Sequence, residues 1–252
     1  MDFTVAYTFA KSEDDNSSDS GVPTLINQGA SAAPGFQGGG PDNWIPRPRR
    51  SDLGRSSFDL RHHLTVSHVI ELPVGRGWWR LGHASGFVNA LVGNWSLAGV
   101  AVLRSGELFN VTCGIDYNDD GDALNDRPAL VSGSLNDLYA RGSLGRTQYL
   151  IPVPDVLTRL NTPGNVTDVF AQIPRNALRA PSVRCYDVSL SQRFQLTEAV
   201  ALGFESNFFN LFNRTNFAGP VAVLTNSRFG RVTNTLAGTN PRQIQLGLKL
   251  TF

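Results

Sequence analysis

The clearest pattern of apolar and polar positions lies in the last eleven residues, 242–252, which read R-Q-I-Q-L-G-L-K-L-T-F. Every second residue from Ile244 to Phe252 is apolar, and Gln, Gly, Lys and Thr occupy the positions between them. Such alternation is typical of a strand with one apolar and one polar face, which a soluble sandwich can also contain. A strand of about 9–11 residues can cross a bilayer at a tilt, and a terminal aromatic ring fits the girdle at a barrel's membrane boundary. The pattern therefore predicts a membrane strand.

Five more segments alternate in the same way. In residues 2–10, for example, the four residues Phe3, Val5, Tyr7 and Phe9 share one face. Period-two alternation of aromatic and β-branched residues is the usual signature of strands. We therefore predict an all-β chain, with residues 108–113 as a candidate extension of its third strand. The six long strands are predicted at residues 2–10, 58–72, 89–104, 183–196, 199–209 and 242–252.

The connections between these strands differ greatly in length. In an antiparallel up-and-down meander, connections 11–57, 105–182 and 210–241 lie at one end of the sheet, and connections 73–88 and 197–198 lie at the other. Long external loops and short periplasmic turns are typical of outer-membrane barrels, which start at about eight strands. Six strands therefore predict an incomplete segment of a transmembrane β-barrel in the cell outer membrane.

Composition agrees with this fold class. The chain of 252 residues holds 25 Gly and 14 Pro, and 10% of its residues are aromatic, which favours strands and turns. A formal charge of +1 gives no indication of a nucleic-acid partner. The sequence has no run of about 20 apolar residues, which excludes a transmembrane helix. No signal peptide follows Met1, so we expect the true start of an exported protein to lie upstream.

Several short motifs occur in a characteristic order along the chain. They are D-L-R-H-H at 59–63, E-L-P-V-G at 71–75, N-W-S-L-A-G at 94–99, S-G-E-L-F at 105–109, D-G-D-A-L-N-D-R-P at 120–128, P-R-N-A-L-R-A-P at 174–181, D-V-S-L at 187–190, F-N-L-F-N-R-T-N-F at 209–217 and the terminal R-Q-I-Q-L-G-L-K-L-T-F. Their order and spacing resemble the C-terminal barrel region of TonB-dependent receptors, specifically the Oar-like transporters. The resemblance covers most of the chain from Asp59 onward.

This resemblance implies a large barrel filled by an N-terminal plug and driven by an inner-membrane energy coupler. On that basis we interpret residues 1–252 as the C-terminal part of such a barrel domain, with the plug and the N-terminal regulatory domain absent. The implied partners are outer-membrane lipid, the barrel-assembly machinery, and a TonB-type coupler that acts only through the missing N-terminal part. The resemblance also makes the last strand the signal for outer-membrane assembly, carried by Ile244, Leu246, Leu248, Leu250 and Phe252.

An acidic loop is the best candidate for a metal site. Its start matches the D-x-N-x-D-G pattern of a calcium loop, in which oxygen ligands at alternate positions converge and Gly permits a sharp turn. Arg127 stands at the twelfth position, where a bidentate Glu is expected, so the motif is incomplete. The alternative is a solvated acidic loop held by its own Asx turns. The candidate Ca²⁺ ligands are Asp116, Asn118, Asp120 and Asp122.

Cys113 and Cys185 are the only cysteines. In the predicted meander they lie at the outer ends of neighbouring strands, so a disulfide that closes the 105–182 loop is geometrically reasonable in an oxidising envelope. However, Cys185 has the parity of the polar face, whereas Cys113 keeps the parity of apolar Phe109 and Val111. A disulfide and a pair of thiols therefore both stay open.

Other titratable residues offer no catalytic set. His62 and His68 have the parity of the apolar, lipid-facing positions of their strand. Six charged residues are candidates for a polar lumen, although inward-facing residues of large barrels are polar without any substrate. They are Arg175, Arg179, Arg184, Arg193, Asp187 and Glu205.

These observations favour one function over two others. We expect binding and gated passage of a bulky substrate through an outer-membrane TonB-dependent receptor, with no enzymatic chemistry and no cofactor beyond the candidate calcium ion. The alternative is an outer-membrane adhesin or surface-display barrel that uses its long loops. A barrel enzyme is the weakest hypothesis, because no Ser/His/Asp or paired-carboxylate arrangement recurs at matching loop ends.

Overall fold

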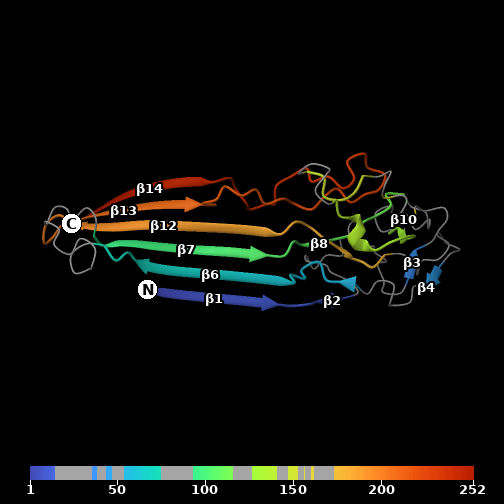
Figure 1. Cartoon of the computed structure of the whole chain (residues 1–252), viewed down its shortest axis with the longest axis horizontal. Helices are drawn as coiled ribbons and strands as arrows, with labels where there is room; N and C mark the ends of the chain where they lie inside the picture. Colours follow the sequence, from blue (N-terminus) through green and yellow to red (C-terminus); the bar gives the residue numbers. More distant parts are fainter. Residues whose placement is uncertain are drawn as a thin grey trace.

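Six long strands form one antiparallel sheet in the computed structural model, in the order β1-β6-β7-β12-β13-β14 (Figure 1). They are β1 (Asp2–Phe9), β6 (His62–Glu71), β7 (Trp95–Arg104), β12 (Val183–Gln195), β13 (Ala201–Phe209) and β14 (Gln243–Thr251). The structure describes residues 1–14, 36–38, 44–46, 54–74, 93–115, 127–140, 147–152, 156, 160–161 and 173–252. Because each strand pairs with the next long strand along the chain, the predicted up-and-down meander is confirmed.

Register brings the apolar positions of all six strands onto a single face. One row joins Val5 to Val66, Val66 to Ala101, and Ala101 to Tyr186. Another joins Phe208 on β13 to Ile244 on β14. Side chains alternate between the two faces of a sheet. One aligned row of residues therefore determines the face on which every other residue of the paired strands lies. The result is a continuous apolar face and, behind it, a polar face.

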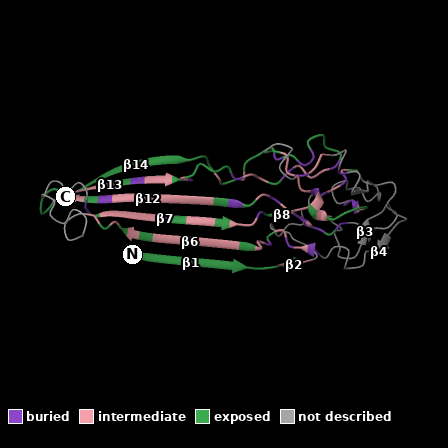
Figure 2. Cartoon of the chain, in the orientation of Figure 1, coloured by how far each residue is buried: buried purple, intermediate pink, exposed green. Residues whose placement is uncertain are grey.

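The apolar face is exposed rather than packed against other protein. Phe3 on β1 is 59% exposed, and Leu248 on β14 is 73% exposed. Figure 2 shows both of these strands as exposed along their whole length, whereas the four strands between them are mostly intermediate. β1 and β14 form the two edges of the sheet, so the barrel is not closed in this structure.

The two ends of the sheet differ in their connections. At the turn end, β12 and β13 are joined by a tight turn in which the N–H groups of Leu196 and Thr197 donate to the Val200 carbonyl. At the loop end, the chain makes three long excursions, between β1 and β6, between β7 and β12, and between β13 and β14. Figure 1 shows the described parts of these excursions, for example β2, β8 and β10, beyond the loop ends of the long strands. We call this part the loop-end lobe.

Short strands and one turn of 3-10 helix organise the loop-end lobe. β8 (Leu108–Phe109) pairs with β11 (Leu178–Arg179) instead of extending β7 within the sheet, so the expected extension through residue 113 is wrong. The 3-10 helix covers Leu135–Leu138. The other strands are β2 (Glu13–Asp14) with β5 (Gly54–Arg55), β3 (Phe36–Gly38) with β4 (Trp44–Pro46), and β9 (Ala129–Leu130) with β10 (Leu160–Asn161).

A hydrophobic core lies inside this lobe. Leu138 and Leu150 are fully buried, and Phe229 from the β13–β14 excursion packs in the same cluster. Burial of such side chains stabilises the lobe by about 1.5–3 kcal/mol each. The whole cluster is Val111, Leu138, Leu150, Val156, Ile173, Leu178, Leu224 and Phe229. Two of the excursions therefore fold together as one body.

No helix within the described ranges is both long and apolar enough to cross a membrane.

Candidate functional site

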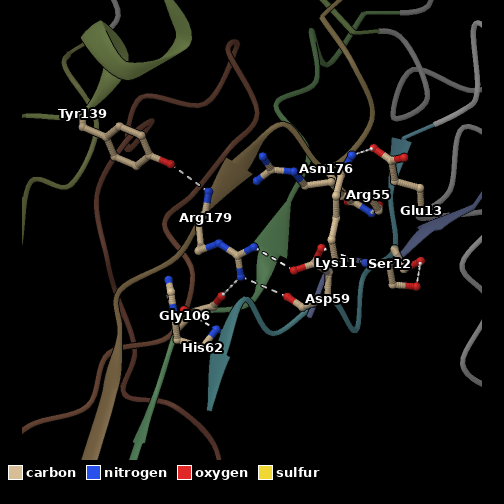
Figure 3. A network of polar contacts seen from close by, with 12 residues as sticks. Lys11, Ser12, Glu13, Arg55, Asp59, His62, Gly106, Tyr139, Asn176 and Arg179 are labelled. Atoms are coloured by element: carbon tan, nitrogen blue, oxygen red, sulfur yellow. Dashed lines mark hydrogen bonds and ion pairs between the residues drawn. The ribbon is translucent and has the colours of Figure 1, made fainter. Parts of the chain in front are cut away.

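A polar network centred on Arg179 ties the loop-end lobe to the sheet (Figure 3). The Arg179 guanidinium donates to the Asp59 carbonyl, the Gly106 carbonyl and Asp59 Oδ1, each at 2.9 Å. The Ser12 N–H donates to the other Asp59 carboxylate oxygen at 3.1 Å. Residues before β6, after β7 and before β12 thus meet at one guanidinium. We call these contacts the Arg179 network.

Two tyrosines hold the backbone of Arg179 from the lobe side. The Arg179 N–H donates to the Tyr139 hydroxyl at 2.8 Å, and the Tyr149 hydroxyl donates to the Arg179 carbonyl at 2.9 Å. The two rings meet edge to face, with centroids 5.5 Å apart. Because both tyrosines also pack against the hydrophobic core of the lobe, Arg179 connects that core to the sheet.

Electrostatics keep the network ionised and ordered at neutral pH. Burial opposes charge on Asp59, but hydrogen bonds from Arg179 and Ser12, together with the charges of Arg179 and Arg55, hold the pKa of that carboxyl below its usual value. Burial, helped by Tyr139, raises the pKa of Tyr149 to about 12. An ionised Asp59 therefore pairs with Arg179, while the neutral phenol of Tyr149 keeps the proton that it donates.

The residues before Arg179 form a strap across the same region. Arg175 is buried and pairs with the Asp14 carboxylate, while Asn176 donates its side-chain N–H to the Arg55 carbonyl at 2.7 Å. Gly106 lies so close to the strap that an added Cβ would stand 1.8 Å from the Ala180 carbonyl oxygen. Only a residue without a side chain permits this approach.

The Arg179 network is built from three of the motifs that carry the family resemblance. Asp59 opens D-L-R-H-H, Gly106 belongs to S-G-E-L-F, and Arg175, Asn176 and Arg179 belong to P-R-N-A-L-R-A-P. These motifs are far apart in sequence, and their side-chain and carbonyl groups meet at one place. Sequence reasoning missed this convergence, because nothing in the spacing of the motifs states that they touch.

A second polar cluster joins β12, β13 and β14 at the loop end. Asn210 N–H donates to Asp187 Oδ1 at 2.7 Å, and the Asn210 side chain exchanges hydrogen bonds with the backbone of Arg214. Asn213 accepts from the Arg242 N–H, and Asn216 exchanges hydrogen bonds with the backbone of Arg184. Asn210 and Asn213 have φ values of 50° and 48°, a left-handed conformation that Asn tolerates well. We call this the asparagine cluster.

The polar face of the sheet carries a hollow of about 400 Å³ across β12, β13 and β14. Register aligns Arg193 with Gly203 and Gly203 with Lys249, while Ser191 aligns with Glu205. No heavy atom lies closer than 3.6 Å to a Cβ placed on Gly203, so glycine leaves this space open. Cationic, anionic and hydroxyl groups therefore line one recess, which suits a polar ligand or polar chain segment.

The predicted site residues have different outcomes. The candidate calcium ligands Asp116, Asn118, Asp120 and Asp122 lie outside the described residues. Within the described part of the chain, no group of three or more His, Cys, Asp or Glu side chains is arranged to hold a metal ion.

Of the two alternatives that the sequence left open for Cys113 and Cys185, the structure has the pair of thiols. Cys113 is buried in the lobe, whereas Cys185 lies on the polar face of β12 and donates to Asp187 Oδ1 at 3.4 Å. The two sulfurs thus belong to different environments, as the difference in their parity indicated.

The expectation of one charged lumen is wrong for three of its six residues. Arg175 and Arg179 are engaged in the loop-end lobe, where their partners are Asp14 and Asp59. Arg184 pairs with Leu103 in register and therefore lies on the apolar face. Arg184 shares the parity of Tyr186, Val188 and Leu190, so alternation within β12 already assigns it to this face. Arg193, Asp187 and Glu205 do lie on the polar face.

An exposed apolar face, a polar face and long connections sorted to one end define a membrane β-barrel protein. The chain belongs to the family described as outer membrane beta barrel domain, whose sequence model matches residues 1–245. Neither a curated protein nor a solved structure matches the chain. Its place is therefore the outer membrane, where the apolar face contacts lipid.

Proposed function

We propose that this chain is a barrel segment of a TonB-dependent receptor of the Oar-like type, which binds a bulky substrate and passes it across the outer membrane. The observation that carries the proposal is the Arg179 network, in which three separate motifs of the family resemblance meet through direct contacts. A chance resemblance of short motifs would give no reason for their residues to meet in space.

The arrangement of the loop-end lobe supports a receptor. Long loops of outer-membrane barrels face the exterior, and here they form a cored body fixed to the sheet by the Asp59–Arg179 pair at 2.9 Å. A rigid external body can present a preformed surface to a large ligand, which lowers the entropy cost of binding. This segment then contributes binding and gated passage, without bond chemistry.

Energy coupling and assembly involve parts and partners beyond the sheet. In this proposal a TonB-type coupler acts through the N-terminal part of the whole receptor, and the barrel-assembly machinery reads the apolar face of β14. That face presents Ile244, Leu246, Leu248, Leu250 and Phe252, all of which are more than half exposed.

The proposal can be tested in the bacterium that makes the protein. Cells with the gene disrupted are compared with the parent for the solutes that they remove from the medium, before and after the proton gradient is collapsed. We expect a bulky solute to persist in the medium of the disrupted strain and of the uncoupled parent. Equal removal by both strains, together with loss of attachment to surfaces or cells, would instead identify an adhesin.

A single substitution links this test to the structure. Arg179→Ala should reduce solute removal while the barrel still reaches the outer membrane, because the lobe loses its connection to the sheet. Arg104→Ala is the matched control, since its pair with Glu107 is local and exposed on the Glu107 side. Full solute removal by the Arg179→Ala strain would contradict a role for the lobe in capture.

A further inference from the structure

The apolar face changes in character where it approaches the loop-end lobe. On β1 and β6, the Tyr7 hydroxyl lies 2.8 Å from His62 Nδ1, and the His62 ring packs against Phe9. On β12, Tyr186 stacks on Phe212 with ring centroids 5.7 Å apart. Amphipathic rings of this kind concentrate at the membrane boundary of barrels. The band of rings therefore marks the level of the outer lipid headgroups.

Three arginines lie next to this band on the β12–β14 side. Arg184 faces the apolar side by its register with Leu103. Arg214 follows Phe212 by two residues, and Arg242 precedes apolar Ile244 by two. All three are exposed. The segment from Asn210 to Asn216 fixes the backbone of each of them through the asparagine cluster.

No carboxylate among the described residues balances the charge of these arginines. Within the described ranges, none of the three forms an ion pair. The nearby carboxylate of Asp187 lies on the opposite face of the sheet and accepts hydrogen bonds from Asn210 N–H and Cys185. Three exposed arginines, whose backbones the asparagine cluster holds beside the ring band, thus have no acidic partner among the described residues.

Phosphate is the anion that best complements such a group. Guanidinium presents a planar fork of donors that matches phosphate oxygens and binds them in pairs. Each basic residue near an anionic lipid surface strengthens binding by about fivefold. We propose that Arg184, Arg214 and Arg242, beside the ring of Phe212, bind the phosphate groups of a phosphorylated glycolipid in the outer leaflet.

The test uses the whole protein purified in a neutral detergent. Its affinity is measured for bis-phosphorylated lipid A in mixed micelles and, as the comparison ligand, for lipid A with both phosphates removed. We expect preference for the phosphorylated lipid, and a loss of about fivefold for each Arg→Gln change and about a hundredfold for all three. Arg104→Gln, on the polar face at the same end of the sheet, is the control and should leave the affinity unchanged.

Further measurements separate recognition from folding and from free phosphate. A triple Arg→Lys variant keeps the positive charge but loses the planar fork, so its affinity should lie between those of the wild type and the triple Gln variant. If the triple Gln variant does not fold, wild-type affinity in the Lys variant would show that the fork is not used. Millimolar inorganic phosphate should compete only weakly if the lipid is the ligand, and complete displacement would assign the site to free phosphate. Equal affinity for phosphate-free lipid A, or wild-type affinity in a folded triple Gln variant, would overturn the proposal.

Discussion

The membrane sheet and the loop-end lobe keep their apolar side chains away from water in different ways: the sheet against lipid, and the lobe in a protein core. On the sheet, Leu248 is 73% exposed and contacts lipid, whereas Leu138 in the lobe is 0% exposed and contacts only protein. The sheet therefore needs no core, because the bilayer is its apolar solvent, and the backbone groups between its paired strands are satisfied, whereas the outer edges of β1 and β14 have no neighbour in this sheet. The lobe stands in water and must build a core of its own.

This contrast explains where polar interactions become important. In the lobe, a buried carboxylate such as Asp59 requires a partner, and Arg179 supplies it. In the sheet, most polar residues lie on the face that looks away from lipid, where Arg193 and Lys249 line the hollow, although Arg184 and His62 lie on the apolar face. The two regions meet at the Arg179 network and the asparagine cluster. The polar contacts there fix the position of the lobe relative to the sheet.

The largest expected effect comes from breaking the junction between the two regions. Arg179→Ala leaves the Asp59 carboxylate buried without its ion-pair partner, which should destabilise the lobe by about 3–5 kcal/mol. Hydrogen exchange should then rise in residues 127–152 and 173–182, while the sheet keeps its protection. Arg104→Ala, which removes a more exposed pair, should cost at most about 1 kcal/mol. Unchanged exchange in the lobe would contradict the role given to Arg179.

A somewhat smaller loss of stability is expected from a charged substitution on the sheet. Its size distinguishes the lipid-facing side from the polar side. Leu246→Arg places a charge on the lipid-facing side of β14 near the middle of the strand, at an expected cost of about 2–4 kcal/mol. Gln245→Arg changes the adjacent residue on the polar face at nearly the same depth and should cost much less. Urea titration of the protein folded in lipid vesicles measures both. Equal costs for the two variants would show that the faces are wrongly assigned.

Acidification should lower the stability of the lobe by a smaller amount than these substitutions do. Because the pKa of Asp59 is lowered in the folded state, its contribution to stability is complete above the unfolded value of about 3.8 and is lost as pH falls through the lower folded value. Exchange in the lobe should therefore rise below about pH 4. Asp59→Asn removes this titration and should flatten the response. A wild-type response that persists in Asp59→Asn would assign the acid sensitivity to another group.

Alternation made the sheet predictable. Each of the six predicted segments contains one long strand, and the second and third strands start later than expected, at His62 and Trp95. Those differences arise at loop junctions, where residues such as Phe58 keep an apolar identity but leave the pairing. Element boundaries are fixed by hydrogen bonds to a neighbour, which a periodic pattern does not specify.

The lobe and its sites were much less predictable. Alternation disappears in the excursions, so their core residues, for example Leu138, Leu150 and Phe229, gave no periodic signal. Asn213 and Asn216 belong to the F-N-L-F-N-R-T-N-F motif, but their hydrogen bonds to the backbone of Arg242 and Arg184 could not be read from it. Contacts between segments that are distant in sequence depend on how the loops fold back, and one sequence carries no direct record of that geometry.

The amino-acid sequence by itself determined the strands, their direction and the face of each that meets lipid, because side-chain alternation is a local property with a fixed period. The alternation also predicted the outer-membrane location, because a bilayer supplies the apolar solvent that one apolar face of such strands requires. Tertiary structure decided the Arg179 network, the asparagine cluster and the hydrogen bonds that hold the backbone of Arg184. Those depend on meetings between residues such as Asp59 and Arg179, which lie 120 positions apart.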